Sequence, residues 1–287
     1  MNDRPTRPAR PANPTHVGRV LRTEQLTPHM IRVVLGGEGL SAFATGPYTD
    51  SYVKLVFPQP GVEYPQPLDM AAVRRDLPRE QWPTTRTYTV RAFDPAGPEL
   101  VIDFVHHGDT GLAGPWAAAA REGDEIAILG PGGGYAPAPE SDWHLLVGDE
   151  SALPAIAASV EALPEGAVAR VFVEIAGAQE EQKLTPPAGD IDIVWVDRSA
   201  GQYGDALLAA VTAADLPGGT GQAFIHGEAH WVKALRRHLR HDLGMKPSQL
   251  SVSGYWRRGA DEDGWQSGKA EWNRGVEEEQ EGGAHAA

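Results

Sequence analysis

The sequence changes character at a Pro/Gly-rich stretch over residues 130–142, and this change restricts the folds open to the chain. Before it, from residue 16 onwards, short runs rich in β-branched and aromatic residues are separated by turns that contain Gly or Pro. This pattern is typical of an antiparallel sandwich or a Greek-key β-barrel. One segment of helical composition, 113–121, interrupts it. After the stretch, apolar runs alternate with helical segments, which predicts a mostly parallel sheet covered by helices.

The segments of the second half have the lengths and compositions expected of such a sheet. Near-continuous apolar runs, as at 169–177 and 191–197, indicate strands buried on both faces. Further strands are expected at 143–150, 221–229 and 249–258, and helices at 151–163, 203–214 and 230–244. We therefore predict a two-domain chain of β + α/β class, divided into a disordered tail (1–15), a β-barrel domain (16–137), an α/β domain (138–264) and an acidic C-terminal tail (265–287).

Composition excludes several classes of protein. The formal net charge of −14 and a pI near 5.1 argue against a nucleic-acid-binding protein, which needs a basic face. No apolar run is long enough to cross a bilayer, and the Pro/Arg-rich N-terminus does not resemble a signal peptide. With no cysteine, the chain has no disulfide, thiolate metal site or thiol nucleophile. We expect a cytoplasmic protein with a local basic pocket for any anionic ligand.

The stretch "RTYTVR" (86–91) carries the first chemical indication. Strand alternation places Arg86 and Tyr88 on one face and Thr87 and Thr89 on the other. A half-buried strand would explain this pattern by itself. The same residues suit a flavin, because an arginine fork binds a pyrophosphate, a tyrosine offers a ring face, and a threonine hydroxyl can meet the polar edge of the ring system.

A second indication is the segment 103–120, "DFVHHGDTGLAGPWAAAA". A strand ends at His107, and a turn containing Gly111 leads into a helix that is expected to begin near Ala113. Glycines let backbone N–H groups approach a ligand, and the start of a helix favours an anion. An ordinary strand–turn–helix connection is the alternative.

Two further stretches follow strands of the α/β domain. "VGDESALPAI" (147–156) occupies the place of a dinucleotide site but lacks G-x-G-x-x-G, and the carboxylates of Asp149 and Glu150 would repel a pyrophosphate there. Capping of the next helix by Asp149 or Ser151 is the alternative. In "SGYWRRGADEDGW" (253–265), two aromatic residues and two arginines end the last strand, either to cover a flavin and meet an anion or as a packed aromatic corner.

These four stretches, in this order, resemble the siderophore-interacting protein family of FAD-binding ferric-siderophore reductases. The resemblance covers about 16–264, and its specific parts are 86–91, 107–117, 148–155 and 254–257. Three positions differ from what members commonly carry. Leu112 replaces a Pro, Gly114 replaces a Ser, and Gly132 replaces a basic residue.

The resemblance implies an FAD-binding barrel followed by a domain of nicotinamide-reductase type. The cofactor-binding residues that it implies are Arg86, Tyr88, Thr89, Val105, His107, Gly111, Ala113, Gly114, Trp116, Asp149, Glu150, Tyr255 and Trp256. It assigns the reaction to Thr89 near the flavin N5 and to Lys54 and Arg257, which neutralise an anionic ferric chelate. No resident metal is expected.

The function implied is reduction of ferric siderophores, in which electrons pass from NADH or NADPH through FAD to Fe(III), and Fe(II) leaves its hard oxygen ligands. Reduced ferredoxin is an alternative donor, since a phosphate loop is absent. Arg198 could meet an adenosine 2′-phosphate or be a solvated turn residue. A general NAD(P)H:flavin reductase and a non-catalytic siderophore carrier are the competing functions. We expect a monomer whose other histidines, including His226 and His238, are structural or solvated.

Overall fold

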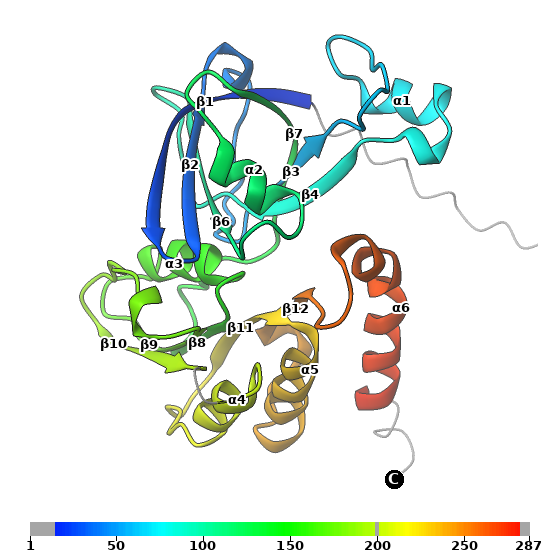
Figure 1. Ribbon diagram of the computed structural model, residues 1–287. Coiled ribbons are helices and arrows are strands. Elements are labelled where there is room, and N and C mark those ends of the chain that lie inside the picture. The colour runs from blue at the N-terminus through cyan, green and yellow to red at the C-terminus, as the bar shows by residue number, and fades with distance from the viewer. Residues whose placement is uncertain (1–14, 199–200, 282–287) are drawn as a thin grey trace, which may run out of the picture.

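The computed structural model describes residues 15–198 and 201–281, and it contains two sheets of different kinds (Figure 1). The tail predicted for residues 1–15 lies outside the described residues except for Thr15, which begins the first strand. The N-terminal sheet is antiparallel and the C-terminal sheet is parallel, as the change of pattern at 130–142 predicts.

The antiparallel sheet contains seven strands in the order β4-β3-β7-β1-β2-β6-β5. Their bounds are β1 Thr15–Thr27, β2 Met30–Gly36, β3 Tyr52–Phe57, β4 Thr84–Thr89, β5 Ala92–Asp94, β6 Glu99–Val105 and β7 Glu125–Gly132. Alternate side chains from these strands, such as Val33, Leu55 and Ile128, form one buried apolar core. Because one face packs inward and the other faces solvent or the second domain, the strands show the period of two in hydrophobicity.

Closure of this sheet into a complete hydrogen-bonded barrel, which the sequence predicts, is not seen among the described residues. The order of hydrogen-bonded strands ends at β4 on one side and at β5 on the other. The sheet nevertheless curls, since the rings of Tyr88 on β4 and Phe104 on β6 have centroids 4.4 Å apart. The seam between β4 and β6 is therefore closed by aromatic packing rather than by a ladder of hydrogen bonds.

Two short helices decorate this sheet. Helix α1 (Met70–Asp76) is capped at its N-terminus by Asp69, whose carboxylate accepts hydrogen bonds from the backbone N–H groups of Ala71 and Ala72. Helix α2 (Ala113–Ala119) lies within the segment predicted to be helical and packs Ala113 and Ala117 into the core. The remaining short helical turns are 3₁₀ turns at Glu38–Leu40 and Arg79–Gln81.

The parallel sheet has the strand order β10-β9-β8-β11-β12. Its strands are β8 Trp143–Gly148, β9 Val168–Ile175, β10 Asp190–Asp197, β11 Gly221–Glu228 and β12 Leu250–Trp256. Helix α3 (Leu153–Glu161) covers one face, while α4 (Asp205–Thr212) and α5 (Ala229–Arg237) cover the other. A π-helical turn (His238–Asp242) extends α5, and 3₁₀ turns lie at Ala178–Glu180 and Pro247–Gln249. The order reverses between β8 and β11, and open α/β sheets bind ligands at such a reversal.

Polar contacts join the two domains on the side where α3 faces the antiparallel sheet (Figure 1). The guanidinium of Arg91 pairs with the carboxylate of Glu161 at 2.5 Å. Thr27 donates its hydroxyl to Glu180 at 2.5 Å, and His29 Nδ1 lies 2.6 Å from the other oxygen of that carboxylate. The contacts of Thr27 and His29 hold the end of β1 against the α/β domain, and Arg91 adds a contact from the segment after β4.

The segment predicted as an acidic tail forms a helix, α6 (Glu262–Glu281), which packs on the α/β domain. Trp265 is only 3% exposed and contacts Trp272 edge to face, with ring centroids 5.4 Å apart. At the other end, Glu281 pairs with Arg236 and Arg240 of α5 and its extension. Trp265 therefore docks on β12, and Trp272 packs on Trp265.

Candidate functional site

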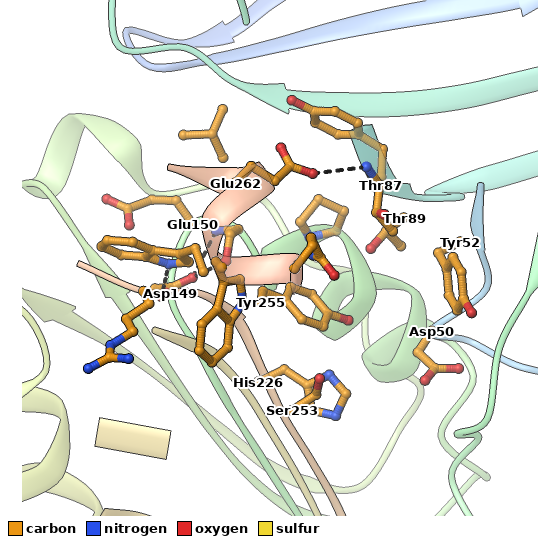
Figure 2. Close-up of a pocket in the computed structure, with 18 of the residues that line it drawn as sticks. Asp50, Tyr52, Thr87, Thr89, Asp149, Glu150, His226, Ser253, Tyr255 and Glu262 are labelled. Carbon is orange, nitrogen blue, oxygen red and sulfur yellow. Dashed lines mark hydrogen bonds between the residues drawn. The ribbon is translucent and has the colours of Figure 1, made fainter. Parts of the chain in front are cut away.

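A cavity of about 790 Å³ lies between the two domains, at the upper end of the range for small-molecule sites. Three parts of the fold line it: strands β3, β4 and β6, the carboxyl ends of β8, β11 and β12, and the start of α6 (Figure 2). The predicted site residues that line it are Lys54, Tyr88, Thr89, Val105, His107, Asp149, Glu150, Tyr255, Trp256 and Arg257. The structure thus brings together residues that are up to about two hundred positions apart in sequence.

Strand β4 supplies one wall of the cavity. Tyr88 packs its ring on Phe104, and burial raises the pKa of its phenol. Thr89 is buried and lies opposite Tyr52 of β3 in the β3–β4 register. It also contacts the hydroxyl of Tyr255 from the other domain. The hydroxyl of Thr89 therefore lies where the two domains meet.

The opposite wall is organised by the buried carboxylate of Asp149 (Figure 2). One oxygen accepts from the backbone and hydroxyl of Ser151, and the other accepts from the backbone N–H of Glu228 and from Trp256 Nε1. Burial raises the pKa of Asp149 despite these donors. Helix α3 has no side-chain cap, so Asp149 links the ends of β8, β11 and β12 instead of capping the helix.

Glu150 and Arg198 form a buried ion pair beside this wall. Arg198 lies 2.7 Å from Glu150 and 3.4 Å from Glu174, and its guanidinium stacks over the ring of Tyr203. Its side chain is 9% exposed, so the interpretation as a solvated turn residue is wrong, whereas contact with an adenosine 2′-phosphate stays a prediction. The guanidinium of Arg198 is therefore already bound by two carboxylates and by the ring of Tyr203.

Besides the paired Arg198, three cations line the cavity. Lys54 and Arg257 do so as predicted, and Lys269 from α6 is a third that sequence reasoning missed. Lys269 donates to the hydroxyl of Ser253 at 3.0 Å, and burial, together with the nearby charge of Lys54, lowers its pKa. The segment around Lys269 was expected to be a tail, and only its 3.6-residue periodicity could have indicated a docked helix.

His226 also lines the cavity, on the end of β11 (Figure 2). Its ring stacks on Phe224, with centroids 3.7 Å apart, and Nε2 lies 2.9 Å from the hydroxyl of Ser251. Burial lowers its pKa to about 3, so the imidazole is neutral near pH 7. Nδ1 is buried and has no protein partner.

Five predicted cofactor residues lie outside the cavity lining: Arg86, Gly111, Ala113, Gly114 and Trp116. Ala113 and Trp116 pack into or against the core of the antiparallel sheet. Gly114 lets α2 approach the end of β6, because a Cβ there would lie 3.1 Å from the carbonyl oxygen of Val105. Their contact with a cofactor stays a prediction.

Arg86 points to the start of α6 instead of into the cavity. Its guanidinium lies 3.1 Å from the carboxylate of Glu262 and 2.9 Å from that of Asp263. Glu262 also accepts the backbone N–H of Thr87 at 3.4 Å (Figure 2). The guanidinium of Arg86 therefore forms an anion-binding site, and carboxylates of this chain occupy that site.

The residues around the cavity fit the flavin that the sequence predicts. Two tyrosine rings, Tyr88 and Tyr255, offer apolar faces beside the hydroxyl of Thr89, and His226 Nδ1 is a buried polar atom without a protein partner. Arg86 adds a site that binds anions. No group of three or more His, Asp or Glu is placed to hold a metal ion in 15–198 and 201–281.

The chain is similar to known proteins over both domains. The profile described as "Siderophore-interacting FAD-binding domain" matches residues 19–135, and the one described as "Siderophore-interacting protein" matches residues 141–259. The chain is 32% identical to ferric vibriobactin reductase ViuB of Vibrio cholerae, over 85% of this chain and 90% of that protein. It is 31% identical to the NADPH-dependent ferric-chelate reductase of Escherichia coli, over 83% and 91%.

Among solved structures, the siderophore-interacting protein SipS from Aeromonas hydrophila has a similar fold. The TM-score is 0.76 at 29% sequence identity, and the match covers 92% of this chain and all of the other. The likeness therefore includes both domains.

Proposed function

This chain belongs to the siderophore-interacting protein family, and from that premise we propose that it reduces ferric siderophores with FAD and a nicotinamide donor. One observation carries the proposal. A single cavity joins the β4 residues suited to a flavin, the ligand edge of a parallel α/β sheet, and lysines suited to an anionic chelate. A carrier would need only the last of these three features.

The residues of β4 and β12 would hold the cofactor. Tyr88 and Tyr255 would pack on its ring system, Thr89 would donate a hydrogen bond at the ring edge, and Arg86 would bind phosphate. Bound FAD supplies the exchange between a two-electron donor and a one-electron acceptor. The wall built on Asp149 keeps Trp256 and the ends of β8 and β11 in place around it.

The lysines would bind the substrate. Lys54 and Lys269 lie close enough for their charges to interact, and Arg257 lines the same cavity. Like charges held together in a cleft favour an anion, which neutralises them. Fe(III) reaches the protein inside its chelator, as substrate, and after reduction Fe(II) binds the hard oxygen ligands less tightly and leaves.

The crevice between β8 and β11 supports a nicotinamide as donor. The relative from E. coli is named as NADPH-dependent. In this chain Arg198 is already paired, which removes one possible ligand for the 2′-phosphate of NADPH. The donor is therefore proposed to be NADH or NADPH, and reduced ferredoxin is the alternative.

The test is an anaerobic visible spectrum of the protein reconstituted with FAD. We expect NADH or NADPH to bleach the flavin bands and a ferric siderophore to restore them. Bands that neither nucleotide bleaches, but reduced ferredoxin does, would replace the donor. Release of free reduced flavin without preference for ferric chelates would indicate a flavin reductase, and absence of any flavin binding would leave the carrier.

The finer expectations of a monomer and a cytoplasmic location stay predictions. Sedimentation of the purified protein and fractionation of cells would test them. Among the described residues, no helix is long and apolar enough to span a bilayer.

A further inference from the structure

The first turn of α6 binds the arginine that the proposed function reserves for a phosphate. Arg86 Nη1 and Nη2 donate to the two carboxylate oxygens of Asp263 at 2.9 and 3.0 Å, and Arg86 Nε lies 3.1 Å from Glu262. Nη1 also donates to the carbonyl of Thr85. These contacts use the fork that arginine presents to carboxylate or phosphate groups. A phosphate group could not pair with the same fork at the same time.

The contact is built so that it can be exchanged. Arg86 is 14% exposed, but Asp263 is 68% exposed, so water and a competing anion can reach the carboxylate side of this ion pair. Burial raises the pKa of Glu262 even though Arg86 opposes this, so its carboxylate is poorly solvated there.

The rest of α6 is held independently of Arg86. Trp265 packs over Gly254 of β12, and the far end pairs Glu279 with Lys233 and Glu281 with Arg240. The lead-in after β12 contains Gly259 at φ +80°, a conformation that favours glycine. None of these contacts involves Arg86, so the side chains of Glu262 and Asp263 can leave Arg86 while Trp265 and the rest of the helix stay docked.

From these contacts we infer that Glu262 and Asp263 are a built-in competitor for the flavin phosphates, so that FAD binding and docking of the first turn of α6 oppose each other. The inference rests on the proposed function, because it takes FAD as the ligand. It assigns to the acidic pair the role of setting how tightly this chain retains its cofactor, and it links cofactor binding to the helix that carries Lys269 into the substrate cavity.

The test compares binding of FAD and riboflavin to flavin-free protein by flavin fluorescence. Riboflavin has the same ring system but no phosphate. In the variant Glu262→Gln/Asp263→Asn, the Kd for FAD should fall roughly five- to tenfold while that for riboflavin stays unchanged. The matched control is Glu277→Gln/Glu278→Gln, which makes the same change in charge at exposed positions of the same helix and should leave both Kd values unchanged.

A second measurement follows the helix itself. Hydrogen exchange at residues 262–266 of the unmutated protein should become faster when FAD is added, and not when riboflavin is added. If Glu262→Gln/Asp263→Asn does not fold, Asp263→Asn alone serves, because that side chain is mostly exposed.

The results distinguish failure of the proposed competition from failure of the proposed reductase function. An unchanged or weaker affinity of the variant for FAD, with wild-type protein that binds FAD, would mean that the acids position Arg86 or are neutral. The inference would then fail and the reductase would stand. If no form of the protein binds FAD, both fail.

Discussion

Trp256 Nε1 donates to Asp149 Oδ2 at 2.9 Å, and this bond ties the last strand of the parallel sheet to the loop after its first strand. The same oxygen accepts the backbone N–H of Glu228. One carboxylate therefore joins three strand ends around the cavity. Sequence inspection suggested either helix capping or a poor phosphate site at this position, and the observed role is neither.

The Asp149 network predicts a loss of stability in Asp149→Asn. An amide nitrogen cannot accept from the N–H donors that surround it, so at least one buried donor is left unpaired. We expect the free energy of unfolding to fall by about 1–3 kcal/mol in urea titrations. Asp215→Asn, at an exposed position, is the control. A variant as stable as the wild type would contradict the role assigned to Asp149.

Replacement of Arg198 by Ala leaves Glu150 and Glu174 buried without their cation. Removal of one partner from a buried pair costs about 3–5 kcal/mol, which urea titration would detect. The triple variant Arg198→Met/Glu150→Gln/Glu174→Gln should be more stable than Arg198→Ala, because no uncompensated charge stays buried. An Arg198→Ala protein of full stability that loses only its affinity for NADPH would instead assign Arg198 to the 2′-phosphate.

Substitution of a cavity lysine should weaken binding of the ferric chelate without changing the reaction with the electron donor. Lys269→Met should raise KM for an anionic ferric siderophore by about tenfold, since one of two neighbouring cations is lost. The rate of flavin reduction by nicotinamide should change little. Lys183→Met, outside the cavity, controls for net charge. Equal loss for a cationic chelate would show that Lys269 acts through the fold of α6 instead.

We expect a steric effect from substitution of Gly132, which lies against the cavity residue Tyr52. A Cβ at residue 132 would lie 2.5 Å from the ring of Tyr52, which is 41% exposed beside Lys54. Gly132→Ala should push this ring aside and raise KM for bulky ferric siderophores more than for small ferric chelates. Gly97→Ala, outside the cavity lining and where a Cβ meets nothing within 4 Å, should have no effect. Equal kinetics for both variants would refute this prediction.

His226 predicts a pH dependence of stability. Its folded-state pKa is lowered to about 3, against 6.5 as its ordinary value, so the unfolded chain binds a proton that the folded protein excludes. The folded protein therefore suffers no penalty from His226 above pH 6.5, and its free energy of unfolding decreases as the pH falls from 6.5 towards 3. Relative to His226→Leu, the wild type should lose about 1.4 kcal/mol more per pH unit between about pH 6 and pH 3. Parallel pH profiles would contradict this.

The order of secondary structure could be predicted from the sequence because local patterns carry it. Period-two strands before residue 130 and alternating strands and helices after residue 142 are consequences of which faces are buried. The stretches around Thr89 and Tyr255 could be singled out because their residue types suit a flavin. That they line one cavity was an expectation drawn from the resemblance, and the fold places them there.

Only the tertiary structure determined which partner each charged side chain has. Arg86 meets Glu262 across 176 positions of sequence, Arg198 meets Glu150 across 48, and Lys269 reaches Ser253 only because α6 docks. A charged side chain reads the same in sequence whether it is solvated, paired or facing a ligand, since its partners come from other elements. The pattern of burial along the chain determines the fold class, whereas long-range packing determines which cations are free to bind a substrate.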